Sequence, residues 1–104
     1  MTERILERLA AANIQLLPVD LDNHFVFERD GFIALVERRR DNSFGRAGSA
    51  GLMTEKGLAP LVWRGDVPYF VAKGLPDQQG AQEQVDLLRR FQADLESALA
   101  GPVA

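Results

Sequence analysis

The sequence predicts an α+β fold, an antiparallel meander of about four or five strands built from two hairpins, with an N-terminal and a C-terminal helix packed on the sheet. Asp30-Gly31 and Gly65-Asp66 each separate two runs of aromatic and β-branched residues, and apolar residues recur at helical spacing near the C-terminus. The 104 residues have room for one domain, residues 1–104, because a chain of this length builds a single core.

The N-terminal helix is expected over residues 3–13. Thr2 is a suitable N-cap, and one apolar face is formed by residues three and four apart: Ile5, Leu9, Ala12 and Leu16. Asn13 suits a left-handed stop, and Pro18 ends any longer helix because it lacks an amide donor.

The first hairpin is predicted from His24–Arg29 and Phe32–Arg39 around Asp30-Gly31, a pair that tolerates the positive φ values of a type I′ turn. A two-residue loop fixes the register. One face then pairs Arg29 with Phe32, Phe27 with Ala34 and Phe25 with Val36, and the other pairs Val26 with Leu35 and Glu28 with Ile33.

The second hairpin is predicted from Leu58–Arg64 and Val67–Lys73 around Gly65-Asp66, where glycine comes first as a type II′ turn requires. This register pairs Val62 with Tyr69, Leu61 with Phe70 and Trp63 with Pro68. Pro60 and Pro68 each remove a ladder donor, which places them at an edge or facing outward.

Between the hairpins, a short strand over Ala50–Thr54 is favoured, followed by a turn at Glu55-Lys56-Gly57. The alternative is a helical turn over Thr54–Leu58.

The C-terminal helix follows a turn at Leu75-Pro76-Asp77, with Asp77 as a candidate cap, and ends at Gly101-Pro102. We expect residues 101–104 to fray. Its apolar face consists of Ala81, Val85, Leu88, Phe91 or Gln92, Leu95 and Leu99.

Both hairpins carry apolar residues on both faces, although an antiparallel sheet with one solvated face alternates more cleanly. The second face therefore needs a cover. One helix could lie on each side, the sheet could curl toward a barrel, or a partner could cover the face. We favour a homodimer over a monomer, because isologous dimers are the commonest oligomers.

The candidate site is the segment 38–51, predicted as a flexible basic loop between the hairpins. Four arginines and one aspartate make it positive within a chain of net charge −3. The predicted ligand- or partner-binding residues are Arg38, Arg39, Arg40, Arg46, Gly45 and Gly48. A phosphate-binding P-loop is not indicated, because the segment leads into a strand and not into a helix.

Other chemistries have less support. The absence of cysteine excludes disulfides and thiolate sites. Asp20, Asp22 and His24 alternate as metal ligands could, but a polar turn explains them better, so neither a metal nor a cofactor is expected. Nucleophilic catalysis would need Ser49 and His24, the one histidine of the chain. Ser49 does not lie in the strand–turn–helix sequence of a nucleophile elbow, so this chemistry is not favoured. A pI near 5.1 disfavours nucleic acid, and no segment resembles a signal peptide or a membrane span, which favours the cytoplasm.

Two functional hypotheses follow. The favoured one is a noncatalytic protein-interaction module, acidic and homodimeric, that offers an apolar sheet face or the segment 38–51 to a protein partner. The alternative is an anionic-ligand-binding protein or modest enzyme that uses the same segment, with Trp63 and Tyr69 as walls of the site and His24 as an acid or base.

Overall fold

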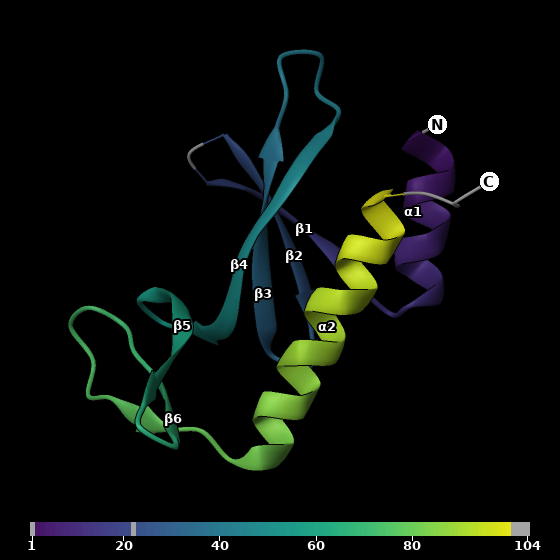
Figure 1. Ribbon diagram of the computed structural model, residues 1–104. Coiled ribbons are helices and arrows are strands. Elements are labelled where there is room, and N and C mark those ends of the chain that lie inside the picture. Colours follow the sequence, from purple (N-terminus) through teal and green to yellow (C-terminus); the bar gives the residue numbers. More distant parts are fainter. Residues whose placement is uncertain (1, 22, 101–104) are drawn as a thin grey trace.

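The computed structural model describes residues 2–21 and 23–100. Within these residues a curled antiparallel sheet of seven strands runs in chain order between two helices, which confirms the predicted fold class with more strands than expected. Figure 1 shows α2 lying across the sheet and α1 beside the C-terminal half of α2. The elements are α1 (Thr2–Ala11), β1 (Gln15–Leu21), β2 (His24–Arg29), β3 (Phe32–Arg38), β4 (Phe44–Thr54), β5 (Gly57–Arg64), β6 (Val67–Phe70), β7 (Gln78–Gln79) and α2 (Gln82–Ala100).

Both predicted hairpins form with the predicted registers. In β2–β3, Arg29 pairs with Phe32 and the ladder continues to His24 opposite Glu37. Asp30 and Gly31 have φ values of 54° and 86°, as a type I′ turn requires. In β5–β6, Val62 pairs with Tyr69, and Gly65 has a φ of 65°. Turn chemistry was therefore enough to fix both registers.

Three segments differ from the sequence prediction. Asn13 stops α1 in the left-handed conformation as expected (φ 60°), but the chain then forms β1, which was not predicted. The register of β1 shifts between Leu16 and Asp20, and Pro18 lies within this irregular stretch. An edge strand tolerates a proline and a bulge, and β1 is an edge strand. Both features disturb the alternation of apolar and polar residues by which a strand is recognised in a sequence. Near the other end, Gln78–Gln79 form β7, so α2 begins at Gln82 and Asp77 is not its cap.

The predicted loop over 38–51 is wrong for its second half, because β4 begins at Phe44 and includes the strand expected at residues 50–54. Along β3 the partners Ala34, Val36 and Arg38 are two residues apart. Their partners along β4 are three residues apart: Ala50, Ala47 and Phe44. Two successive irregularities thus give β4 a period of three, and bulges of this kind increase strand twist.

The glycines of β4 allow close approach between strands. A Cβ added to Gly51 would lie 2.7 Å from the carbonyl carbon of Ala59 on β5, and one added to Gly48 would lie 3.1 Å from the carbonyl oxygen of Leu35 on β3. At Gly45 the nearest atoms, 3.0 Å away, belong to Glu37. The three glycines are thus explained by packing between neighbouring strands.

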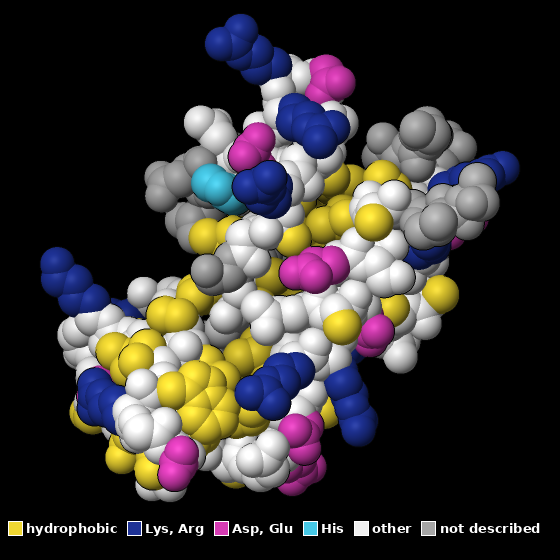
Figure 2. All heavy atoms as spheres, in the orientation of Figure 1, with side chains coloured by type: hydrophobic (Ala, Val, Ile, Leu, Met, Phe, Trp, Pro, Cys, Tyr) yellow, Lys and Arg dark blue, Asp and Glu magenta, His cyan; other side chains and the backbone are white. Residues whose placement is uncertain are grey.

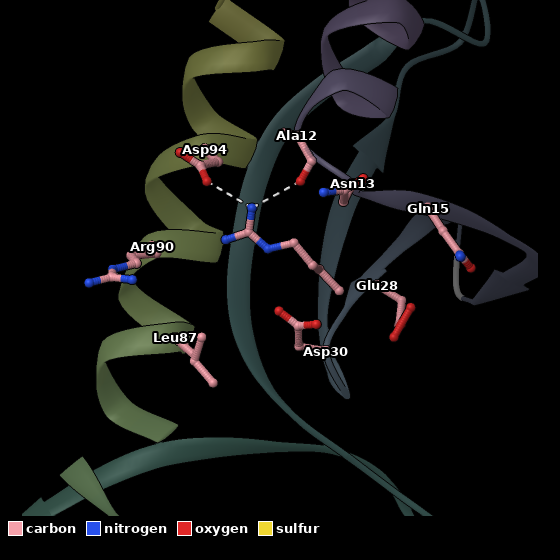
Figure 3. Close-up of a pocket in the computed structure, with 9 residues that line it drawn as sticks. Ala12, Asn13, Gln15, Glu28, Asp30, Leu87, Arg90 and Asp94 are labelled. Carbon is pink, nitrogen blue, oxygen red and sulfur yellow. Dashed lines mark hydrogen bonds and ion pairs between the residues drawn. The ribbon is translucent and has the colours of Figure 1, made fainter. Parts of the chain in front are cut away.

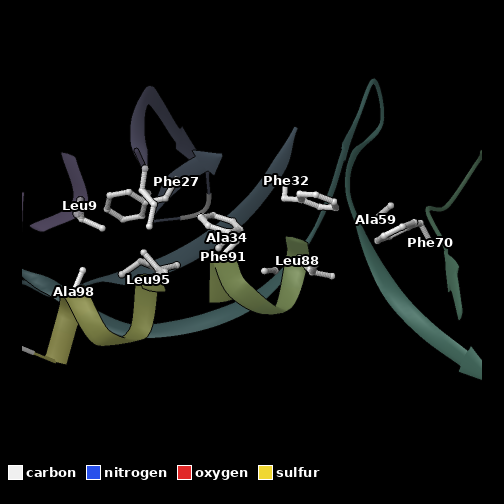
Figure 4. Close-up of a cluster of buried hydrophobic side chains, with 13 residues drawn as sticks. Leu9, Phe27, Phe32, Ala34, Ala59, Phe70, Leu88, Phe91, Leu95 and Ala98 are labelled. Carbon is white, nitrogen blue, oxygen red and sulfur yellow. The ribbon is translucent and has the colours of Figure 1, made fainter. Parts of the chain in front are cut away.

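The core lies between one face of the sheet and the two helices (Figure 4). Residues from α1, β2 to β6 and α2 form one buried cluster, which includes Leu9, Phe27, Phe32, Phe70, Phe91 and Leu95. Since both helices contribute to this cluster, the alternative with one helix on each side of the sheet is wrong. Arg8 on α1 ties the helices together by donating from Nε and Nη2 to the carbonyl oxygen of Ala98, at 2.9 and 2.7 Å.

Neither of the two described helices packs on the opposite face of the sheet, and we call this face the helix-free face. Val26 and Ile33 at its centre are buried, whereas Met53 is 49% and Val62 39% exposed. Curling of the sheet therefore shelters the centre of this face and leaves apolar side chains exposed toward β5.

Candidate functional site

The β3–β4 turn projects beyond the other strands (Figure 1) and is fixed by its own hydrogen bonds. The amide of Arg39 donates to the carbonyl oxygen of Ser43 at 3.0 Å, and the amide of Asn42 donates to that of Arg39 at 2.9 Å. Asn42 has a φ of 65°, in the left-handed region that asparagine tolerates. In the remainder of the predicted loop, Arg38 ends β3 and residues 39–43 form a defined turn.

Asp41 stabilises this turn with its side chain. Its Oδ1 accepts a hydrogen bond from Ser43 Oγ at 2.6 Å and another from the Ser43 amide at 3.0 Å. These two bonds, in that order, lower the pKa of Asp41 below its ordinary value, and the charge of Arg39 lowers it further. Asp41 is therefore ionised at neutral pH and engaged within the turn.

A cavity of about 320 Å³ lies beside the turn and is lined by Asn23, Arg38, Arg39, Arg40 and Asn42. We call it the arginine pocket. Three of the predicted site residues, Arg38, Arg39 and Arg40, thus lie around one cavity. The side-chain amides of Asn23, between β1 and β2, and of Asn42, between β3 and β4, lie around the same cavity. All five side chains carry N–H donors, and none of the five is acidic, so the lining suits an anion.

Arg38 is positioned by an aromatic contact. Its guanidinium carbon lies 4.3 Å from the centroid of Phe25, and Phe25 in turn meets the edge of Phe44 with ring centroids 4.7 Å apart. Stacking on a half-buried ring orders a guanidinium that would otherwise sample many rotamers. Arg38 is thus held partly buried at the end of β3.

A second cavity, of about 300 Å³, adjoins the first through the same side chain. It is lined by Leu16, Leu17, Pro18, Val19, Phe25 and Arg38, and we call it the apolar groove. Leu16 is 43% exposed and Val19 54% exposed. Sequence reasoning missed this groove because β1 was not recognised, although the run Leu16-Leu17-Pro18-Val19 was its signal.

The other predicted site residues lie elsewhere. Arg46 lines a cavity of about 300 Å³ together with His24, Glu37, Leu35 and Leu58. Figure 2 shows the histidine, in cyan, next to basic side chains. Gly45 and Gly48 serve strand packing, as described above. The predicted set is therefore divided between two places.

The predicted walls of a small-molecule site do not converge on the arginine pocket. Trp63 lines a cavity beside α2, where the guanidinium carbon of Arg89 lies 5.8 Å from its ring centroid. Tyr69 packs against Arg64, whose guanidinium carbon lies 5.0 Å from the centroid of the tyrosine ring. Trp63 and Tyr69 point to opposite faces of the β5–β6 ladder, since Trp63 pairs with Pro68 and Tyr69 with Val62.

A cavity of about 410 Å³ lies between α2, the end of α1 and the β2–β3 turn, with Asp94, Ala12 and Asp30 around it (Figure 3). Arg29 also lines this cavity. Arg29 Nη1 donates to Asp94 Oδ2 at 2.7 Å and to the carbonyl oxygen of Ala12 at 3.1 Å. Its guanidinium carbon also lies 5.6 Å from the centroid of Phe91. Arg29 therefore joins β2 to the end of α1 and to α2 through its Nη1.

Among the described residues there is no group of three or more acidic or histidine side chains placed to hold a metal. Asp22 of the alternating Asp20, Asp22 and His24 set lies outside the described residues.

Neither described helix has the length and apolar composition needed to cross a lipid bilayer. Comparison with known proteins found no matching family model, no matching curated protein and no matching solved structure.

Proposed function

We propose that this protein is a noncatalytic protein-interaction module that binds a partner segment carrying apolar and acidic side chains. The observation that carries the proposal is that one residue, Arg38, lines both the apolar groove and the arginine pocket. A segment lying across Arg38 can place an apolar side chain on one side of it and an acidic side chain on the other.

The apolar groove supplies affinity. Leu16 and Val19 are large side chains left exposed beside the ring of Phe25. Covering apolar surface stabilises a complex by roughly 25 cal/mol per Å², before the entropic costs of association. The groove therefore favours leucine-like side chains in the partner.

The arginine pocket supplies selectivity. The segment 38–51 is positive, whereas the chain as a whole has a net charge of −3. An acidic partner is attracted at this end and repelled by the rest of the surface, which orients its approach. Exposed charges are screened by salt, so binding should weaken as ionic strength rises.

The partner segment is expected to dock through its side chains. β1 is an edge strand, which in principle could accept an added strand. Pro18 has no amide hydrogen, however, and the register shift between Leu16 and Asp20 interrupts the ladder. These two features are among those that discourage edge-to-edge pairing.

The lining of the arginine pocket favours binding over catalysis. Guanidinium groups keep their protons at any physiological pH, and side-chain amides do not titrate. Such a set holds an anion, but it supplies neither a general base nor a nucleophile.

The proposal is tested by fluorescence anisotropy with a labelled peptide of alternating leucine and glutamate. Two comparison peptides replace all glutamates by lysine or all leucines by serine. We expect the leucine–glutamate peptide to bind most tightly, and Arg38→Gln or Val19→Ser to weaken it about tenfold, equivalent to roughly 1.4 kcal/mol. Arg90→Gln, an exposed arginine on α2, is the matched control. Equal binding of the three peptides, or an equal loss in the control variant, would contradict the proposal.

Self-association is a second proposal, on a different surface. Met53 and Val62 are exposed on the helix-free face, and a second copy of the chain could cover both at once in an isologous dimer.

A further inference from the structure

We infer that this chain has a binding site for a small aromatic carboxylate, in the cavity between Trp63 and α2. The cavity has a volume of about 280 Å³, and its lining includes Leu61, Trp63, Leu88, Arg89 and Gln92. We call it the tryptophan pocket. It shares no lining residue with the apolar groove or the arginine pocket, so the inference is independent of the proposed function.

Trp63 supplies an aromatic surface that the fold leaves partly uncovered. It is the one tryptophan of the chain, and it is 45% exposed. A tryptophan ring carries a large apolar surface, and it packs favourably on other aromatic rings in offset or edge-to-face contacts. Leu61 and the buried Leu88 extend the apolar part of the lining. A ligand with a planar apolar ring is therefore favoured.

Arg89 supplies a positive charge beside this ring. Its guanidinium carbon lies 5.8 Å from the centroid of Trp63, within the range of a cation–π contact. Among the described residues no carboxylate forms an ion pair with Arg89. Asp86, one turn earlier on α2, accepts a hydrogen bond from Gln82 Nε2 at 2.9 Å. The guanidinium therefore keeps N–H donors for a ligand carboxylate, which it can bind through two parallel hydrogen bonds.

The lining suits a single negative charge. Gln92 follows Arg89 by three residues on α2, so the two side chains are neighbours on the helix surface. The amide of Gln92 can donate to a carboxylate oxygen, and no acidic residue is among the described residues that line the cavity. One guanidinium balances one carboxylate, whereas a phosphoryl group of about −1.5 to −2 would leave excess negative charge. A carboxylate is therefore favoured over a phosphate ester.

The volume of the pocket limits the ligand to a small molecule. An apolar cavity of about 150 Å³ is large enough to bind benzene. The tryptophan pocket, at about 280 Å³, has room for one such ring together with a carboxylate. Trp63 and Arg89 are both exposed, so a ligand reaches them directly from solvent.

The fluorescence of Trp63 reports binding directly, because the chain has no other tryptophan. The probe is benzoate, and it is compared with benzamide, which lacks the charge, and with cyclohexanecarboxylate, which lacks the aromatic ring. We expect benzoate to quench the fluorescence with a saturable dependence on concentration. It should bind at least about tenfold more tightly than either analogue, with all three affinities measured by isothermal titration calorimetry.

Two variants assign these preferences to side chains. In Arg89→Gln the preference for benzoate over benzamide should disappear. Arg90→Gln, the matched control, removes the charge of the neighbouring exposed arginine and should retain that preference. In Trp63→Leu, measured by calorimetry, the preference for benzoate over cyclohexanecarboxylate should disappear. Circular dichroism of each variant verifies that the fold is retained.

Four results would overturn the inference. The first is that benzoate does not bind, or binds no more tightly than benzamide. The second is an equal loss of preference in Arg89→Gln and Arg90→Gln, which would assign it to the charge of α2 as a whole. The third is tighter binding of phenyl phosphate than of benzoate. The fourth is tighter binding of a peptide that ends in phenylalanine, which would make the ligand a chain terminus and not a free small molecule.

Discussion

Arginines of the same chain have different roles according to what surrounds them. Arg29 is largely buried and is held by Asp94, a backbone carbonyl and the ring of Phe91. Arg64 forms an exposed ion pair with Asp77 at 2.6 Å, of a kind that contributes about 0–1 kcal/mol. Arg38 is stacked on Phe25 at the junction of two cavities. The sequence shows where the arginines cluster, but only the contacts show that Arg29 joins three elements of the fold and that Arg38 stacks on an aromatic ring.

At this scale we predict the titration of Asp41. Its pKa in the folded protein should lie below 3.8, the ordinary value, because Ser43 donates two hydrogen bonds to the ionised carboxylate. Since the folded pKa is the lower one, this contribution to stability is complete above the unfolded pKa and is lost as the pH falls through the folded pKa. Carbon-detected NMR of the Asp41 carboxyl group measures the midpoint.

Ser43→Ala removes the 2.6 Å hydrogen bond and leaves the amide bond, so the pKa of Asp41 should rise toward 3.8 without reaching it. Ser97→Ala, at an exposed serine of α2, is the control and should leave the titration unchanged. An unchanged midpoint in the Ser43 variant would show that the hydroxyl does not stabilise the ionised form.

At the scale of elements, the success of sequence reasoning depended on regular geometry. Asp30-Gly31 and Gly65-Asp66 fixed two registers because short hairpin turns tolerate few conformations. β1 and the first half of β4 could not be predicted in the same way. Their irregularities place an extra residue between inward-facing positions, which destroys the period of two. The glycine period in 45–51 was visible in the sequence, but it signalled close strand packing and not a phosphate-binding loop.

We predict that Gly51→Ala destabilises the fold more than Gly48→Ala. An alanine Cβ at position 51 would contact rigid backbone of Ala59, with its carbonyl carbon only 2.7 Å away, whereas at position 48 the nearest atom is 3.1 Å away. Forced overpacking of this kind costs about 1–3 kcal/mol in the free energy of unfolding. Urea denaturation of the two variants and the wild type measures the difference. Equal stability of the two variants would contradict the prediction, because the closer contact at position 51 would then cost no more than the contact at position 48.

At the scale of the whole molecule, the fold separates a covered face from an open one. Both helices pack on the same face of the sheet, and curling of the sheet buries Val26 and Ile33 on the other. The sequence indicated that the second face needs a cover, because both hairpins carry apolar residues on both faces. It did not indicate that curling would provide part of that cover, because the first half of β4 was expected to be a loop and β1 was not predicted. Met53 and Val62 remain exposed, and self-association is the last prediction that follows from them.

We predict that the chain forms a dimer through the helix-free face. Burying Met53 and Val62 of both copies removes the exposed parts of four apolar side chains from water. Since each is already more than half buried, each contributes less than the about 1.5–3 kcal/mol of a side chain that goes from full exposure to full burial. Met53→Glu with Val62→Glu should shift sedimentation velocity profiles to a monomer at concentrations where the wild type is dimeric. Leu6→Glu, an exposed leucine on α1, is the control because it replaces an exposed apolar side chain by a negative charge on the helical side. If the wild type sediments as a monomer over the whole accessible concentration range, or if the Leu6 variant dissociates equally, the helix-free face is not the dimer interface.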